Sequence, residues 1–184
     1  MDAELDKFEN KYIPLNLFTL ENKTILLYAI TLFVFPMIFT QQLIVGSIVN
    51  ALLINSAITL NSKKVFILAL IPSIATVTGG VLFGALSMQI VYLLPFIWIA
   101  NSALMYFVRK LFLKKKLSYK KSITISAPIK VLILSIASIS LFVLGVVPFE
   151  FVLMFSALQI ITIILGAVLV ATKNVFKNKV TNWI

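Results

Sequence analysis

Few residues in this chain have side chains that could do chemistry. The sequence contains no Cys and no His, and five of its six acidic residues lie within the first 21 positions. These absences exclude thiolate and imidazole metal sites, histidine-dependent nucleophiles and paired carboxylates within the rest of the chain. The remaining candidates are isolated polar residues inside long apolar runs, which can bind a ligand through hydrogen bonds or charge. We therefore predict a protein that is not an enzyme and that uses no metal or cofactor.

Four polar residues lie in four different apolar runs at similar depth, namely Asn50, Asn101, Lys130 and Gln159. In a membrane interior a polar side chain is costly unless it meets a partner or a cavity. The three amides can also bridge helices and have no other task, and Lys130 can instead extend towards the lipid headgroups. If Lys130 faces a cavity, it would meet an anionic group of a ligand or amide oxygens that line a wet cavity, because no acidic residue lies at that depth.

A second group of candidates consists of amides near the ends of apolar runs and of aromatic residues within one run. Three glutamines flank uncharged connections, and aromatic rings that include Tyr92, Phe96 and Trp98 share the run that contains Asn101. The rings would stack on a flat ligand or pack against lipid and neighbouring helices. The candidate substrate-binding residues are therefore Gln41, Gln42, Asn50, Gln89, Tyr92, Trp98, Asn101, Lys130 and Gln159.

The elements that must position these residues follow from the composition. Of the 184 residues, 61% are hydrophobic and 12% are charged, and the mean hydropathy is +1.08. Soluble domains are about half apolar and a quarter charged, so we predict an all-α protein with six transmembrane helices, each of roughly 20 apolar residues. The expected spans are Thr24–Thr40, Leu43–Leu60, Val65–Thr78, Gln89–Val108, Ser122–Gly145 and Phe149–Thr172.

The basic residues predict how the spans are oriented. Every Lys and Arg except Lys130 lies before the first span, after the second, after the fourth or after the sixth. Cytoplasmic loops carry an excess of Lys and Arg, so we expect a multi-pass protein of the cell membrane with both termini in the cytoplasm. These loops then account for the net charge of +10. Membrane lipid is an expected partner, and no nucleic-acid partner is expected.

The ends of the chain differ from the membrane domain. The expected divisions are an amphipathic cytoplasmic or interfacial segment at 1–23, a six-helix membrane domain at 24–172 and a basic cytoplasmic tail at 173–184. The first segment has apolar residues at helical spacing, including Phe8 and Tyr12, which suits a helix lying on the membrane surface; a partly ordered tail is the alternative. The glycine-rich stretch Gly79–Gln89 is either a gating loop or a simple helix break.

This organisation resembles the substrate-binding S components of energy-coupling factor (ECF) vitamin transporters. Two stretches carry the local similarity: QLIVGSIVNALL at 42–53 looks like the start of the second helix of small S-component-like proteins, and PFIWIAN at 95–101 is similar to part of the fourth. The resemblance implies a subunit that captures a vitamin or related micronutrient beneath the outer loops. It would then dock on a membrane scaffold subunit that is driven by two ATPases.

Two features bear on this docking. The sequence has no Gly-x-x-x-x-Gly-Lys-Ser/Thr motif, so ATP hydrolysis would belong to the partners. S components often carry an Ala-x-x-x-Ala face on the first helix, whereas Ala29 is flanked four residues away by Ile25 and Phe33. The nearest ridge of small residues is Ala167 with Ala171 in the last span, which leaves a solitary carrier or a different partner open.

The alternative function is a structural or assembly subunit of a larger membrane complex with no ligand of its own. In that case the polar residues would only tie helices together. The two hypotheses differ in the outer half of the bundle. A binding protein should contain a closed, partly polar cavity, typically of about 300 Å³ or more, whereas a structural subunit should be packed solid there.

Overall fold

The computed structural model describes residues 15–60, 63–79 and 89–181. All regular secondary structure in these ranges is helical, which confirms the predicted all-α fold. The elements are α2 (Leu15–Ile38), α3 (Gln42–Thr59), η1 (Lys63–Ala69), α4 (Ile71–Gly79), α5 (Ile90–Arg109), η3 (Lys110–Lys114), α6 (Tyr119–Val143), α7 (Phe149–Phe155) and α8 (Ala157–Thr181).

Five helical stretches are long and apolar enough to cross a membrane, in agreement with five of the six expected spans. They are Leu20–Ile38, Gln42–Thr59, Ile90–Lys114, Tyr119–Val143 and Phe149–Thr172. The predicted membrane class and its transmembrane helices are therefore supported by the structure. The expected span at Val65–Thr78 is built differently from the other five.

This third stretch is a 3₁₀-helix, η1, followed by the short helix α4. Pro72 explains the division, because it has no N–H and its ring would clash with the carbonyl of Leu68 in a continuous α-helix. The first turn of a new helix tolerates proline, and α4 accordingly begins at Ile71. A 3₁₀-helix rises about 2 Å per residue, so η1 and α4 together extend roughly 28 Å, close to the thickness of a bilayer core.

Two other boundaries differ from the expected ones. α2 begins at Leu15, so the helix already includes the end of the segment expected to lie on the membrane surface. Phe8 and Tyr12 lie outside the described residues, as does most of the glycine-rich stretch after Gly79. The last span is divided at Ser156, whose backbone leaves the helical region between α7 and α8.

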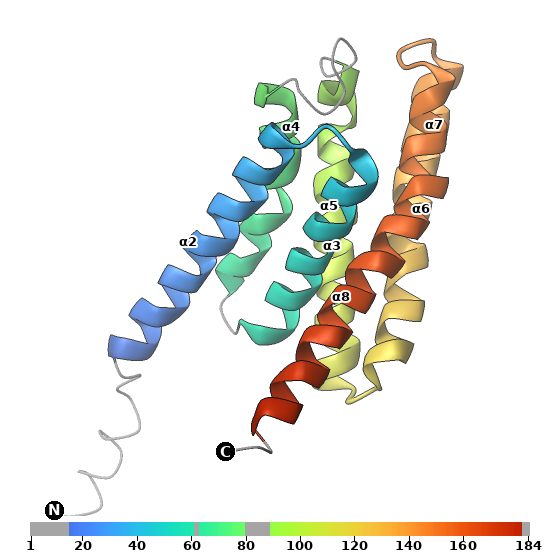
Figure 1. Cartoon of the computed structure of the whole chain (residues 1–184). Helices are drawn as coiled ribbons and strands as arrows, with labels where there is room; N and C mark the ends of the chain where they lie inside the picture. The colour runs from blue at the N-terminus through green and yellow to red at the C-terminus, as the bar shows by residue number, and fades with distance from the viewer. Residues whose placement is uncertain (1–14, 61–62, 80–88, 182–184) are drawn as a thin grey trace, which may run out of the picture.

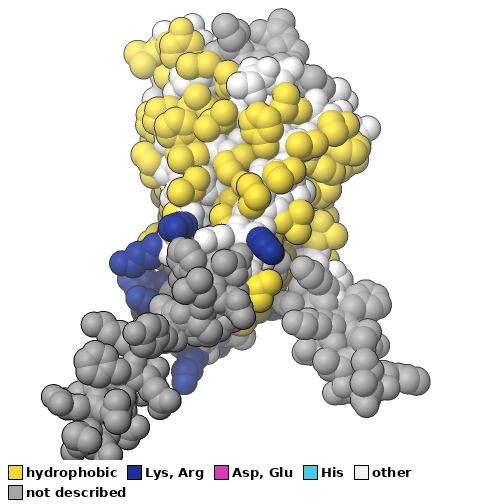
Figure 2. Space-filling model, turned by 90° about the vertical axis from the view of Figure 1, so that its left-hand side faces the viewer, with side chains coloured by type: hydrophobic (Ala, Val, Ile, Leu, Met, Phe, Trp, Pro, Cys, Tyr) yellow, Lys and Arg dark blue, Asp and Glu magenta, His cyan; other side chains and the backbone are white. Residues whose placement is uncertain are grey.

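The chain runs back and forth between the two ends of an elongated bundle (Figure 1). The beginning of α2 and the end of α8 lie at the same end. Lys63, Arg109 and Lys120 belong to the connections and helix termini at this end, which we call the basic end. Figure 2 shows one face of the bundle, with hydrophobic side chains over its upper part and Lys and Arg gathered below them.

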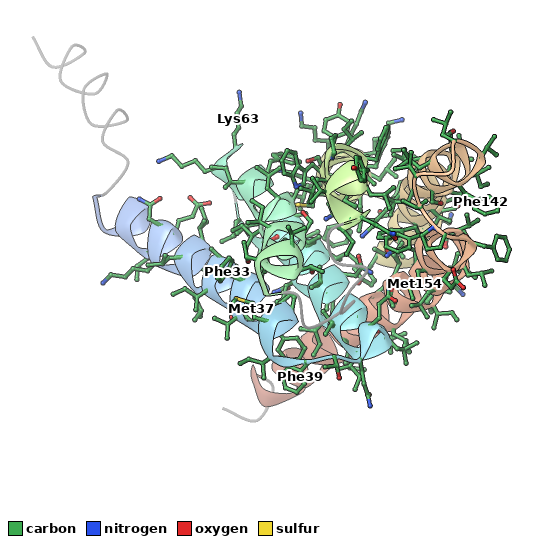
Figure 3. The ribbon with its side chains drawn as sticks, turned by 90° about the horizontal axis from the view of Figure 1, so that it is seen from above. Phe33, Met37, Phe39, Lys63, Phe142 and Met154 are labelled. Carbon is green, nitrogen blue, oxygen red and sulfur yellow. The ribbon has the colours of Figure 1, made fainter. Side chains whose placement is uncertain are left out.

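Three hydrophobic clusters among the described residues form the core of the bundle. In the half near the basic end, buried residues that include Ile54, Leu104 and Ala167 form one hydrophobic cluster between α3, α5, α6 and α8. A second cluster joins α2, α3 and η1 and also reaches the basic end, whereas the third joins α5, α6 and α7 further from that end. Seen from above, α2 with Phe33 and Met37 lies on one side, and Phe142 lies at the opposite edge (Figure 3).

The crossing of α3 and α8 is close because each helix carries a glycine at the contact, Gly46 on α3 and Gly166 on α8. A Cβ atom added to Gly166 would lie 2.7 Å from the carbonyl oxygen of Ser47 and 2.8 Å from the backbone nitrogen of Ala51. Small residues at helix contacts allow this kind of close approach in membranes. The crossing also buries Ala167, whose carbonyl accepts a hydrogen bond from the Tyr119 hydroxyl at 2.9 Å. The small-residue ridge at Ala167 therefore faces the bundle interior.

We expect Gly166→Ala to destabilise the protein although alanine is the better helix former. The added methyl group meets backbone atoms that cannot move independently, and overpacking of this kind costs about 1–3 kcal/mol. Thermal unfolding followed by circular dichroism in detergent measures the effect, with Val168→Ala on the exposed side of α8 as the control. A melting temperature for Gly166→Ala equal to that of the parent would contradict the close crossing.

Candidate functional site

A cavity of about 90 Å³ lies in the half of the bundle away from the basic end. Five of the nine predicted binding residues line it, namely Gln42, Asn50, Asn101, Lys130 and Gln159. They come from α3, α5, α6 and α8, so the fold brings together residues that are more than 100 positions apart in the sequence. α4 adds Ser73 and Thr76, which the sequence did not single out.

The polar residues form one end of the cavity. On each of α3, α5, α6 and α8, the lining residue nearest the basic end is polar: Asn50, Asn101, Lys130 and Gln159, respectively. We call these four residues the polar floor. Residues at equal depth on neighbouring helices lie at one level of the bundle, and depth within a span therefore indicates which polar residues lie near one another.

The walls above the polar floor are mainly apolar. Four residues further from the basic end, the next lining residues on α5, α6 and α7 are Ile97, Leu134 and Phe155, and on α3 Val49 directly precedes Asn50. Ile90 and Val45 continue this wall, and Gln42 at the first turn of α3 adds an amide near the outer rim. The cavity therefore has a polar floor and an apolar wall.

Lys130 is the charged residue of the floor. It lies 11 residues after the beginning of α6 at Tyr119, which places it roughly 16 Å along the helix. Its side chain is 3% exposed, and Nζ donates a hydrogen bond to Oδ1 of Asn50 at 2.6 Å. The ammonium is thus directed across the bundle interior to α3 and not towards the headgroups.

A chain of hydrogen bonds fixes the orientation of Asn50. Its Nδ2 donates to Oγ1 of Thr162 at 3.1 Å, and this hydroxyl donates to the carbonyl oxygen of Gln159 at 3.1 Å. An ammonium group has no acceptor, so the oxygen of the Asn50 amide must face Lys130 and the nitrogen must face Thr162. Asn50 and Thr162 are each 1% exposed, and their contact depends on the close crossing of α3 and α8.

The charge of Lys130 is uncompensated among the described residues. Glu21 and Glu150 are the acidic residues described; Glu150 is exposed in the first turn of α7, and neither residue lines the cavity. An ammonium has three donors, and among the described residues Lys130 has one hydrogen-bond partner, the neutral Asn50. Charge and donors therefore remain available at the polar floor.

The side of the cavity formed by α4 is held by hydrogen bonds from α5 to the end of η1 and to α4. Nδ2 of Asn101 donates to the carbonyl oxygen of Ala69 at 3.0 Å. Nε1 of Trp98 donates to Oγ of Ser73 at 2.8 Å, and Ser73 in turn donates to the carbonyl oxygen of Leu70. Trp98 thus acts behind the cavity wall as a partner of Ser73, and the ring does not line the cavity.

Three other predicted residues do not line the cavity. Gln41 is exposed immediately before α3, and Tyr92 is 58% exposed on the outside of α5. Gln89 lies directly before α5, and its Oε1 is buried without a hydrogen-bond partner among the described residues. Tyr92 thus lies on a face of α5 that is turned away from the cavity, and the two glutamines lie just before their helices.

The cavity is smaller than the sequence-based expectation for a binding protein. At about 90 Å³, it has room for several water molecules but not the roughly 300 Å³ of a typical ligand pocket. It also differs from the solid packing expected of a purely structural subunit. A ligand that fits without rearrangement of the helices must therefore be small.

We expect Asn50 and Lys130 to be energetically coupled. Asn50→Leu should destabilise the protein by roughly 1–3 kcal/mol, because it leaves the buried ammonium without its acceptor. Lys130→Met should be neutral or stabilising, and the double variant should recover most of the loss. Unfolding free energies of the four proteins give the coupling.

Asn55→Leu provides the matched control for this cycle. Asn55 lies on the same helix and donates to the hydroxyl of Tyr28, so its effect should simply add to that of Lys130→Met. Additive effects for Asn50→Leu and Lys130→Met as well would show that the contact across the bundle contributes nothing.

Comparisons of the chain with protein-family models, curated proteins and solved structures found no match. The family resemblance therefore depends on the organisation and the local stretches described above.

Proposed function

We propose that this protein is an integral membrane subunit that captures a small molecule, a vitamin or related micronutrient, for uptake by an ECF-type transporter. The observation that supports this proposal is a cavity with the buried cation Lys130 at its floor. A lysine near the bilayer centre costs about 2.5–3.5 kcal/mol or more on insertion. A ligand that pairs with the charge gives a physical reason for retaining it.

The position of the cavity agrees with capture from outside. It lies away from the basic end, and the positive-inside rule assigns that end to the cytoplasm. Gln42 at the beginning of α3 and Ile90 at the beginning of α5 line its outer part. The polar floor would then stop a ligand near the middle of the membrane, above the hydrophobic cluster in the half near the basic end.

In this proposal the energy for uptake comes from partners, a membrane scaffold subunit and two ATPases. The burial of Ala167 removes the ridge on the last span as a docking face. Ala29 instead lies beside a shallow apolar groove between α2 and α4, together with Phe33 and Ile74. α2 therefore presents larger side chains than the Ala-x-x-x-Ala face that S components often carry.

A structural or assembly subunit is the second candidate. It is favoured by the hydrogen bonds of Asn50, because they connect α3 to both α6 and α8. Such a link is sufficient to hold three helices in register. It does not account for the space beside Lys130, and this space separates the two candidates.

We expect the gently purified protein to carry a small molecule that is visible by native mass spectrometry. Ile97→Trp should abolish the bound mass, because Ile97 lines the cavity and the larger ring would fill it. Ile99→Trp, on the exposed side of the same helix, is the matched control and should retain it. A parent protein without bound mass, or an Ile97→Trp variant that keeps it, would contradict ligand capture and favour the structural alternative.

Single cysteines should report the orientation of the bundle, because the natural sequence has none. Cysteine at Ser118, the exposed residue before α6, should react with a membrane-impermeant maleimide only from the cytoplasm. Cysteine at Thr40, between α2 and α3, should react only from outside. Leu132, exposed in the middle of α6, is the control that should react from neither side. Labelling of positions 40 and 118 from one side would refute the proposed topology.

A further inference from the structure

The chemistry of the cavity specifies a class of ligand. The polar floor presents one cation, Lys130, beside the neutral amides Asn50, Asn101 and Gln159. The wall above it is apolar and includes Leu134. No acidic residue lines the cavity, so the described residues leave a single positive charge to be matched.

On the basis of the proposed function, we propose that the ligand is a short amphiphilic monoanion, with a carboxylate on Lys130 and an apolar body along the wall. One cation balances one negative charge, which favours a carboxylate over a doubly charged phosphate. Burial of net charge in a low dielectric is unfavourable, so a neutral complex is the stable one. The fixed direction of the polar floor and apolar wall also sets the orientation of the ligand, with its head towards the cytoplasm.

The surroundings of Lys130 prepare it for this role. Asn50 accepts one of its three donors and is itself held by Thr162, so Nζ is positioned before a ligand arrives. The partner is neutral and does not compete for the charge, as a carboxylate of the protein would. Charge-assisted hydrogen bonds from the remaining donors to a carboxylate are about twice as strong as neutral ones.

Three probes of equal length separate charge from shape: hexanoate, hexanamide and hexylammonium. Isothermal titration calorimetry of the full chain in nanodiscs measures their binding. We expect hexanoate to bind at least about tenfold more tightly than hexanamide, and hexylammonium not to bind, because truncation or mismatch of a buried charge partner costs that much or more.

Variants then test whether Lys130 causes the preference for the carboxylate. Lys130→Met should weaken hexanoate binding at least about tenfold and leave hexanamide binding nearly unchanged. Lys130→Arg should retain the preference for the carboxylate. Lys120→Met, which removes an exposed lysine from the same helix, is the matched control and should behave like the parent. Thermal unfolding verifies that each variant is folded.

The outcomes distinguish this inference from the proposed function. Equal binding of hexanoate and hexanamide, or a Lys130→Met variant that keeps the tenfold preference, would overturn the monoanion while ligand capture stands. Absence of binding by all three probes would also overturn it, and the bound mass lost in Ile97→Trp would still support capture. If no bound mass is found either, both proposals fail.

Discussion

The hydrogen bond from Nζ of Lys130 to Oδ1 of Asn50 depends on contacts distributed over three helices. It requires the Lys130 side chain on α6 to reach across the bundle interior to α3, and it requires the oxygen of the Asn50 amide to face Nζ. Thr162 sets that orientation, and it can do so because Gly166 lets α8 approach α3 closely. A methyl group added to Gly166 would therefore change the position of Lys130, because the change would pass through Thr162 and Asn50.

Three hydrophobic clusters among the described residues surround this hydrogen bond. Near the basic end, the helices are joined by a hydrophobic cluster and by the hydrogen bond from Tyr119 to Ala167. Two further clusters, one of α2, α3 and η1 and one of α5, α6 and α7, both contribute residues to the lining of the cavity. The wall residues Val49 and Leu134 belong to opposite clusters. The polar floor has residues from α3, α5, α6 and α8. A ligand on the floor would therefore contact all four helices.

Much of the fold and part of the site could be predicted from the sequence. Hydropathy located five spans, because length and apolar content are sufficient to identify a transmembrane helix. Depth, counted from the span ends, identified all four residues of the polar floor. Rotation could not be predicted, because a helix that is apolar on all sides gives no sign of which face is buried. For this reason Tyr92 was a candidate from the sequence, although its side chain faces outwards. Thr162 was not selected because a threonine hydroxyl in a helix usually bonds to its own backbone.

The most direct test of the account is whether the uncompensated charge acts on molecules that enter the cavity. Thr76 lines the cavity, and its hydroxyl bonds only to the carbonyl of Pro72 on its own helix among the described residues, so cysteine replaces it conservatively. The measurement is the rate at which Thr76→Cys reacts with anionic and cationic methanethiosulfonates added outside, with Lys130 present and in the Lys130→Met background. We expect faster reaction with the anionic reagent and loss of this preference in Lys130→Met. Equal rates for the two reagents with Lys130 present, or no reaction with either, would contradict it.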